Sequence, residues 1–225
     1  MSKPLLYSCW MSSCAWRVRI ALHLKQIDFN VKTISILKTG EPGDQYSEEF
    51  EKINPMKYIP ALEIHGHTLI ESLSIINYLE EAYPKRRLLP KDIFQRTKAR
   101  AISDVICSGI QPLQNLKVQK FSRPDGNLNF EWASFWISQG FSSLENILKE
   151  STGDYCVGNE ITMADCCLVP QVANARRYKI EVSSYPTIAR IDKALQDHEA
   201  FRKAHPSQQP DFPKEVPASF ASQFK

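Results

Sequence analysis

The hydrophobic pattern of residues 1–84 predicts short strands alternating with helices. Leu5 to Tyr7 is an apolar run typical of a buried strand, and Phe29 to Ile36 alternates apolar and polar positions as a second strand does. The helix between them reaches about Gln26, and a crossover of this kind makes the two strands parallel. One face of this helix is apolar, and another is a polar stripe formed by Arg19, His23 and Gln26.

The second half of this region predicts a short helix, a hairpin and a final helix. Asp44 to Lys52 forms a short polar helix at most, and the two prolines at 55 and 60 exclude a helix after it. Apolar residues on both sides of His65-Gly66-His67 indicate a hairpin, and we interpret the two histidines as surface residues without a metal. Glu71-Ser72 then opens a helix from Leu73 to Tyr83.

Beyond residue 84 the strand pattern disappears and helical spacing replaces it. Apolar residues up to Ile110 mark one long helix in which Pro112 should produce a kink, and Phe130 to Leu148 marks another. Thr162 with an aspartate three residues on is a capping pattern that begins a third helix. Pro186 to Gln196 forms a further helix.

These patterns divide the chain into two domains. Residues 1–84 have the element order β-α-β, α, β-β-α, and residues 85–225 are helical, with a proline-rich extended tail from His205. The predicted fold class is therefore an α/β domain followed by an all-α helical bundle. The densest basic stretch, Lys85 to Arg100, lies at the junction, where a solvated connection explains it better than a nucleic-acid site does.

Charge and cysteine content exclude several function classes. The net charge is +3, from 28 basic and 25 acidic residues, which gives no basic stripe for nucleic acid. No apolar run is long enough to span a membrane, and the N-terminus lacks a secretory pattern. The six cysteines form no Cys-x-x-Cys, and no histidine stands at zinc-ligand spacing from them. We therefore expect a cytoplasmic protein with reduced thiols, no metal and no membrane partner.

Residues Ser12 to Arg17 are the candidate chemical centre, because they begin the first helix. The first backbone N–H groups of a helix have no internal partner and carry the positive end of its dipole, so they attract a thiolate or a carboxylate. The alternative is a pair of capping serines followed by a buried structural cysteine. The segment alone leaves both interpretations open.

The most specific motif of the chain is Ser12-Ser13-Cys14-Ala15-Trp16-Arg17-Val18-Arg19-Ile20-Ala21-Leu22. Other motifs are Asn54-Pro55-Met56-Lys57, Gly109 to Leu116, Thr162 to Asp165, Leu168 to Ala175, and His205-Pro206 with Gln209-Pro210-Asp211. These motifs resemble those of the cytosolic glutathione transferases, and of their zeta class in particular, which includes the maleylacetoacetate isomerases. The resemblance covers nearly the whole chain. It implies a thioredoxin-like first domain and a helical second domain.

The resemblance implies glutathione as cofactor, bound by the first domain. It assigns catalytic roles to Ser12, Ser13 and Cys14, with the Ser12 hydroxyl donating a hydrogen bond to the glutathione thiolate. Ile59 would pair its backbone with the cysteinyl unit across a cis Ile59–Pro60 bond. The complete set of implied glutathione-binding residues is Ser12, Ser13, Cys14, Ala15, Trp16, Arg17, Gln45, Ile59, Glu71 and Ser72. For Glu71 and Ser72 the alternative is an ordinary helix start.

The acceptor site is expected between the two domains and should hold a small dicarboxylate. Cations and amide donors suit such a ligand. The implied residues are Arg17, Gln111, Asn115, Leu116, Lys117 and Arg177. Arg177 is the leading candidate, and Arg176 is interpreted as a surface residue. Helix capping near Pro112 is the alternative for Gln111 and Asn115.

The implied reaction is the isomerisation of maleylacetoacetate to fumarylacetoacetate in tyrosine and phenylalanine catabolism, by reversible thiolate addition. Glutathione transfer to α-halo acids is a further activity that the resemblance allows, and a homodimer is expected by analogy. Met11 stands where the family commonly has arginine, and Lys117 stands where a smaller polar residue is expected. Both departures concern the substrate more than the cofactor.

Two other functions remain open. Cys14 could itself form a mixed disulfide with glutathione, as in a thiol transferase or a dehydroascorbate reductase. The serines in front of it favour activation of an external thiol instead. The third possibility is a non-catalytic binding or scaffold protein of this fold. It predicts a disrupted glutathione site, yet Ser12, Pro60, Glu71 and Ser72 are all present.

Overall fold

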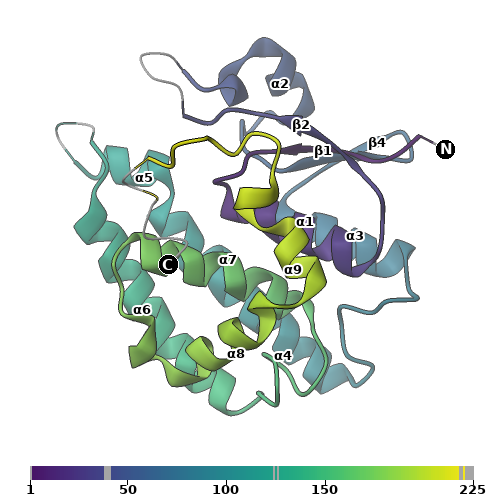
Figure 1. Ribbon diagram of the computed structural model, residues 1–225, viewed down its shortest axis with the longest axis vertical. Coiled ribbons are helices and arrows are strands. Elements are labelled where there is room, and N and C mark those ends of the chain that lie inside the picture. The colour runs from purple at the N-terminus through teal and green to yellow at the C-terminus, as the bar shows by residue number, and fades with distance from the viewer. Residues whose placement is uncertain (1, 38–41, 124, 126, 218–219, 221–225) are drawn as a thin grey trace. The chain divides into compact units, whose positions relative to one another are not determined.

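The computed structural model describes residues 2–37, 42–123, 125, 127–217 and 220 (Figure 1). It divides into two compact units, which we describe separately. The first unit contains residues 1–87 together with 198–214, and the second contains 88–197 together with 215–225. The predicted division was 1–84 and 85–225, so residues 198–214, which were assigned to the helical domain, pack instead with the α/β part.

A four-stranded sheet is the centre of the first unit, with strand order β2-β1-β3-β4. The strands are β1 (Leu5–Ser8), β2 (Asn30–Thr33), β3 (Ala61–Ile64) and β4 (His67–Ile70). As expected from the crossover, β1 and β2 are parallel, and the predicted β3–β4 hairpin is antiparallel. β2 is shorter than the predicted 29–36, although the backbone of Ile34 still donates to Ser8.

Helices cover both faces of this sheet. Tyr7 and Ala61 lie opposite each other on neighbouring strands and pack with Phe50 on the side of α2 (Glu48–Ile53). Leu6 and Leu62 alternate with them and are fully buried on the other face. The helices of that face are α1 (Ser13–Leu24) and α3 (Ser72–Ala82), and α9 (Glu199–Ala204) lies against α1 (Figure 1).

The polar stripe predicted on α1 is wrong at Arg19. His23 is half-buried and Gln26 is exposed, but Arg19 is completely buried. Its guanidinium donates to the side chain of Ser8 and to the carbonyl groups of Cys9 and Ala204. The buried charge is therefore satisfied by the end of β1 and by the returning C-terminal segment, neither of which a helical period can reveal.

The second unit consists of helices. They are α4 (Ile93–Asp104), α5 (Leu116–Phe121), α6 (Phe130–Lys149), α7 (Met163–Arg177) and α8 (Pro186–Gln196). Nearly every residue of α7 is buried, so it is the central helix of this unit. The predicted capping box is present: Thr162 accepts from Ala164, and Asp165 accepts from Thr162. None of the helices in the described residues is long and apolar enough to cross a membrane.

The helix break expected at Pro112 begins earlier in the chain. α4 changes at Val105 into a π-helical turn, Val105–Ile110, which a 3₁₀ turn, Gln111–Gln114, follows. A proline has no N–H to donate, which limits regular helix at this point. A π turn also displaces side chains from the regular helical spacing. The predicted single kinked helix is therefore three short segments.

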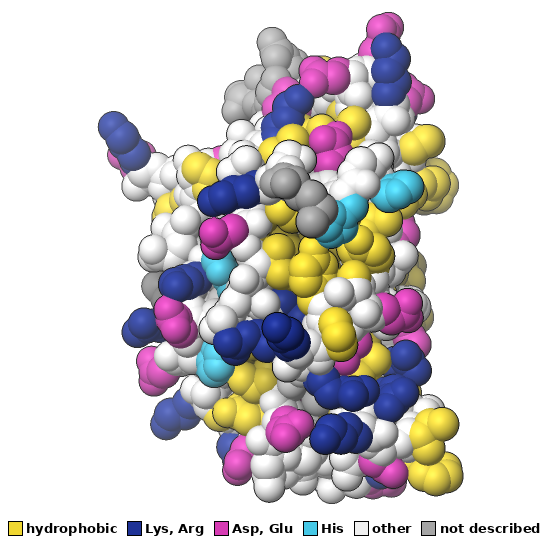
Figure 2. Space-filling model, turned by 90° about the vertical axis from the view of Figure 1, so that its right-hand side faces the viewer, with side chains coloured by type: hydrophobic (Ala, Val, Ile, Leu, Met, Phe, Trp, Pro, Cys, Tyr) yellow, Lys and Arg dark blue, Asp and Glu magenta, His cyan; other side chains and the backbone are white. Residues whose placement is uncertain are grey.

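One face of the molecule agrees with the mixed charge expected from the sequence. On the face shown in Figure 2, basic and acidic side chains are interspersed. That distribution is typical of a solvated surface.

Candidate functional site

The Ser12 hydroxyl at the start of α1 can still donate a hydrogen bond. The Ser12 side chain accepts a hydrogen bond from the backbone of Ala15 at 3.2 Å, and its backbone is extended. This is the capping geometry of the alternative interpretation. A hydroxyl that accepts one hydrogen bond still has its own proton to donate. Capping therefore fixes the position of Ser12 without using up its donor.

Cys14 is not the buried structural cysteine of that alternative. Its side chain is half-buried, whereas Ser13, Ala15 and Trp16 are buried. Trp16 packs edge-on against His205 at 5.3 Å between ring centroids, so the C-terminal segment supports this turn. Cys9, three residues before Ser12, is a different kind of thiol, because burial raises its pKa to about 12.

Arg17 joins the starts of two helices. Its Nη1 lies 3.7 Å from Cys14 Sγ and 3.3 Å from Ser72 Oγ, the first residue of α3. The side chain is 1% exposed. Neither α1 nor α3 has an acidic residue in its first turn. Two positive helix termini and a guanidinium therefore meet here, which is an environment for anions.

The backbone at Glu71 and Ser72 differs from that of an ordinary helix start. Glu71 caps α3 with φ +65°, a conformation unusual for a residue with a side chain, and it makes no side-chain capping bond. Its carboxylate is exposed, while Ser72 is buried. A strained backbone at a helix start is a feature of binding sites.

The bond between Ile59 and Pro60 is cis, as expected. Asn54 holds the turn before it, because its amide donates to the carbonyl of Tyr58 at 2.7 Å. Among the described residues, no backbone–backbone hydrogen bond reaches Ile59. Its backbone is therefore available to pair with an extended peptide.

Gln45 fits a peptide ligand as well. The residue is buried, its Nε2 donates weakly to the carbonyl of Ile36 at 3.4 Å, and its Oε1 finds no partner in the described part of the chain. A buried amide oxygen without a donor costs free energy unless a ligand supplies one. The amide N–H groups of a tripeptide such as glutathione meet this requirement.

The predicted acceptor residues of the second unit have mixed surroundings. Asn115 caps α5 by accepting from the backbone of Lys117 at 3.0 Å, so it has the structural role that the sequence left open. Gln111 begins the 3₁₀ turn beside Pro112. Leu116 and Lys117 are half-buried.

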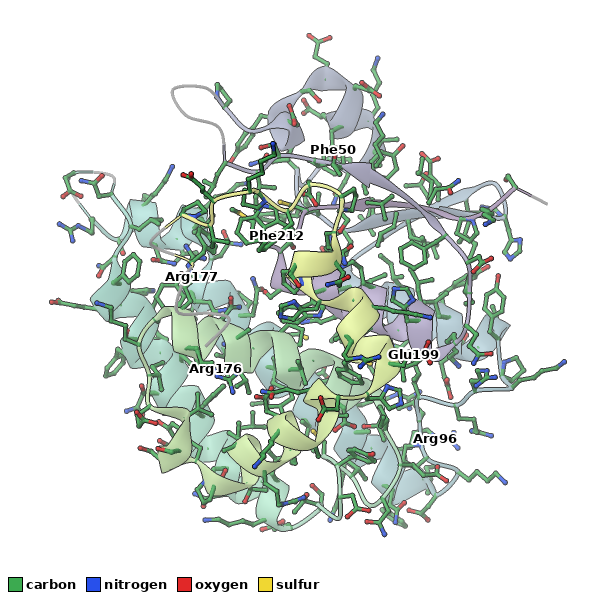
Figure 3. The ribbon with its side chains drawn as sticks, viewed as in Figure 1. Phe50, Arg96, Arg176, Arg177, Glu199 and Phe212 are labelled. Atoms are coloured by element: carbon green, nitrogen blue, oxygen red, sulfur yellow. The ribbon has the colours of Figure 1, made fainter. Side chains whose placement is uncertain are left out.

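Arg177 and Arg176 extend in different directions from the end of α7 (Figure 3). Arg177 is buried, and its guanidinium carbon lies 3.5 Å from the ring centroid of Phe220. Burial lowers the pKa of its guanidinium. Arg176, predicted as a surface residue, is half-buried and forms an ion pair with buried Asp192 at 2.6 Å.

Asp211 also belongs to this region, although no role was predicted for it from the sequence. Its carboxylate accepts from the backbone of Trp10 at 2.9 Å, and Phe212 packs edge-on against the Trp10 ring. Together with Arg19, it holds the segment that leads from β1 to Ser12. Only the recurrence of Asp211 in a family motif pointed to it. In the described residues no group of side chains is arranged to hold a metal ion.

The comparisons with known proteins agree with this geometry. Residues 6–87 match the family model "Glutathione S-transferase, N-terminal domain", and residues 134–203 match "Glutathione S-transferase, C-terminal domain". The chain is 53% identical to maleylacetoacetate isomerase of Mus musculus, over 95% of this chain and 97% of that protein. It is 54% identical to probable maleylacetoacetate isomerase 2 of Drosophila melanogaster, over 96% and 93%.

Solved structures give the same assignment. A maleyl pyruvate isomerase, described as a bacterial glutathione S-transferase in the zeta class, matches with a TM-score of 0.87 and 35% identity, over 93% of this chain and 100% of that one. A maleylacetoacetate isomerase from Anaeromyxobacter dehalogenans with bound GSH matches with a TM-score of 0.83 and 37% identity, over 94% and 98%. The chain therefore belongs to the glutathione S-transferase family, within the zeta-class group of the maleylacetoacetate isomerases.

Proposed function

We propose that the chain is a glutathione-dependent isomerase that converts maleylacetoacetate to fumarylacetoacetate. The observation that carries the proposal is the meeting of the starts of α1 and α3 around Arg17, with Ser12, Cys14 and Ser72 at that point. Relatives more than half identical to this chain have the name of this activity. Glutathione supplies, when bound, a thiolate that adds reversibly to the cis double bond and is recovered unchanged.

Ser12 stabilises the thiolate in this proposal. Lowering the pKa of a thiol by about two units takes about 2.7 kcal/mol. The terminus of a helix contributes about 0.3–1 kcal/mol. A charge-assisted hydrogen bond contributes about 1.5–3 kcal/mol. The helix alone is therefore insufficient, and the hydroxyl proton of Ser12 provides the larger part.

The other residues of the first unit hold and orient the tripeptide. Ser72 and the first N–H groups of α3 bind its γ-glutamyl carboxylate, and Glu71, exposed beside them, binds the ammonium group. Ile59 pairs its backbone with the cysteinyl unit, and Gln45 accepts from a peptide N–H. The neighbouring groups Ser13, Ala15 and Trp16 form the wall behind the thiol. These roles are supported by the burial and the spare hydrogen-bonding groups described above.

Cationic and amide side chains bind the carboxylates of the substrate. Arg177 is the first of these, with Arg17, Gln111 and Lys117 as further donors. Asn115 and Leu116 complete the set. The absence of a cation at Met11 makes Arg177 more important in this chain.

The oligomeric state, the compartment and the pathway are proposed by analogy with the same family. We propose a cytoplasmic homodimer that acts in the degradation of tyrosine and phenylalanine. Large apolar side chains are exposed on α4, where Ile93 and Phe94 are 65% and 77% exposed. A second copy would cover such residues, and the mass of the protein in solution, measured by light scattering, tests the dimer.

The test is the turnover of maleylacetone with catalytic amounts of glutathione. We expect its absorbance to disappear with no net loss of thiol. Ser12→Ala should lower kcat by about a hundredfold or more, since it removes a donor to the developing charge. Ser74→Ala, which changes an exposed serine of α3, is the matched control.

The same assay separates the alternatives. Cys14→Ser should keep most of the isomerase activity. A Cys14→Ser enzyme that is inactive, beside an active Ser12→Ala enzyme, would establish the thiol-transfer function instead. An enzyme that does not bind glutathione in calorimetry would leave only the scaffold function.

A further inference from the structure

Two thiols of the second unit lie in contact. Cys107 belongs to the π-helical turn Val105–Ile110, and Cys167 belongs to α7. Their sulfur atoms are 3.6 Å apart, although the residues are separated by 60 positions in the chain. A disulfide bond is about 2.05 Å long, so the two atoms would need to approach by about 1.5 Å. Rotation of a cysteine side chain moves its sulfur over such a distance.

The contact is part of a polar line along one face of α7. Gln171, one turn after Cys167, exchanges two hydrogen bonds with Gln114, at 3.2 and 3.0 Å. Tyr178, two turns further on, accepts from Gln119 at 2.6 Å. These side chains fix the register between α7 and the segment that starts at the π turn. The two sulfurs are therefore held opposite each other by their surroundings.

The two cysteines differ in their accessibility to solvent. Cys107 is half-buried, whereas Cys167 is completely buried. The other two cysteines of this unit, Cys156 and Cys166, are also completely buried. A small oxidant therefore reaches Cys107 first. The neighbouring sulfur is then in place to react with it.

We propose that Cys107 and Cys167 form a site of reversible oxidation by hydroperoxides. The Cys107 sulfur attacks hydrogen peroxide, the O–O bond breaks, and sulfenic acid and one water result. The Cys167 sulfur then displaces hydroxide from the sulfenic acid, which leaves as a second water once protonated. Two thiols lose two electrons, and the peroxide gains them. Two equivalents of an external thiol reduce the disulfide again.

The oxidised form would differ from the reduced form in stability. A cross-link between positions far apart in the chain restricts the unfolded state. It would also fix the π turn, which directly precedes Gln111, to α7. The proposal itself stands without the isomerase function, because it concerns only these two sulfurs.

The test is a thiol count on the folded protein in a Cys14→Ser background, which removes the half-buried thiol of the first unit. After limited hydrogen peroxide we expect the loss of two thiols, a Cys107–Cys167 peptide pair in a non-reduced digest, and a higher Tm. Dithiothreitol should reverse all three. Adding Cys107→Ala should abolish them, while adding Cys166→Ala, which removes the buried thiol next to Cys167 on α7, should leave them intact.

Two outcomes would overturn the proposal. One is a folded protein whose Cys107 is oxidised to sulfinic acid with Cys167 still a thiol. The other is a disulfide that involves Cys166 or Cys156 in place of Cys167. Circular dichroism before and after treatment establishes that the protein is folded in each case.

Discussion

Arg19 holds three parts of the first unit together with one side chain. Its Nε donates to the carbonyl of Ala204 at 3.0 Å, and its Nη1 donates to Ser8 Oγ at 2.9 Å and to the carbonyl of Cys9 at 3.2 Å. Burial lowers its pKa to about 9, and the nearby carboxylate of Asp211 opposes this shift. The planar, multiply donating guanidinium suits such a position, and lysine does not replace it.

We expect Arg19→Met to destabilise the protein by about 3 kcal/mol or more, because it leaves several buried acceptors without donors. The measurement is chemical denaturation. Arg202→Met is the matched control, since Arg202 is exposed on α9 and the change should stay within about 0.5 kcal/mol. Equal stability of the two variants would contradict the role of Arg19.

At this scale the local sequence pattern offered capping by Ser12 as one of two interpretations, and the structure has that cap. The cis bond before Pro60 was implied by the family resemblance rather than by neighbouring residues, and the structure has it too. Arg19 was misplaced because its partner Ala204 lies 185 residues away. A pattern of spacing within one helix carries no information about such a partner.

The N-terminus of α8 is capped by a side chain of another helix. Pro186 occupies its first position, and Tyr185 makes no side-chain capping bond. Glu145 of α6 accepts instead from the backbone groups of Thr187 and Ile188, at 2.9 and 3.0 Å. Burial raises the pKa of Glu145, but these hydrogen bonds outweigh it, so the pKa lies below its usual value of 4.5.

The stability of the protein should therefore depend on Glu145 in acid. A carboxyl group with a depressed pKa in the folded state stabilises that state fully above the unfolded value, about 4.5, and the contribution is lost as the pH falls through the folded pKa. Glu145→Gln should lower the free energy of unfolding at pH 7 and flatten its decrease below about pH 4.5. Urea denaturation from neutral to acidic pH checks this. Parallel curves for the two proteins would contradict it.

The helix boundaries that depend on a few adjacent residues were predicted from the sequence. The capping box of α7 and both ends of α8 were expected from a few adjacent residues. The π turn Val105–Ile110 was not, because its hydrophobic positions also fit a regular helix. The side chains of this π turn contact α7, as Cys107 does at Cys167. The composition of the turn alone does not reveal its irregular form.

The first unit is built from two distant parts of the chain. Residues 198–214 pack with residues 1–87, and Asp211 and Ala204 contact the end of β1 and Arg19. The sequence placed this segment in the helical domain because it follows the last helices directly. Only the contacts across the fold reveal which unit it completes.

Shortening the chain tests this arrangement. A chain that ends at Asp197 should lose hydrogen-exchange protection around Leu6 and Ser8, because Arg19 and Trp10 lose their partners. A chain that ends at Lys214 keeps those partners and should retain the protection. Similar exchange in both chains would show that residues 198–214 do not support β1.

The discontinuous first unit has a consequence for synthesis on the ribosome. Domains generally fold in the order in which they emerge. Here the strands and helices of the first unit appear first, but Arg19 and Trp10 acquire their partners only when residues 204 and 211 have been made. The helices from 88 to 197 are complete before that. The part of the nascent chain that carries Ser12 is therefore translated long before it is fully held in place.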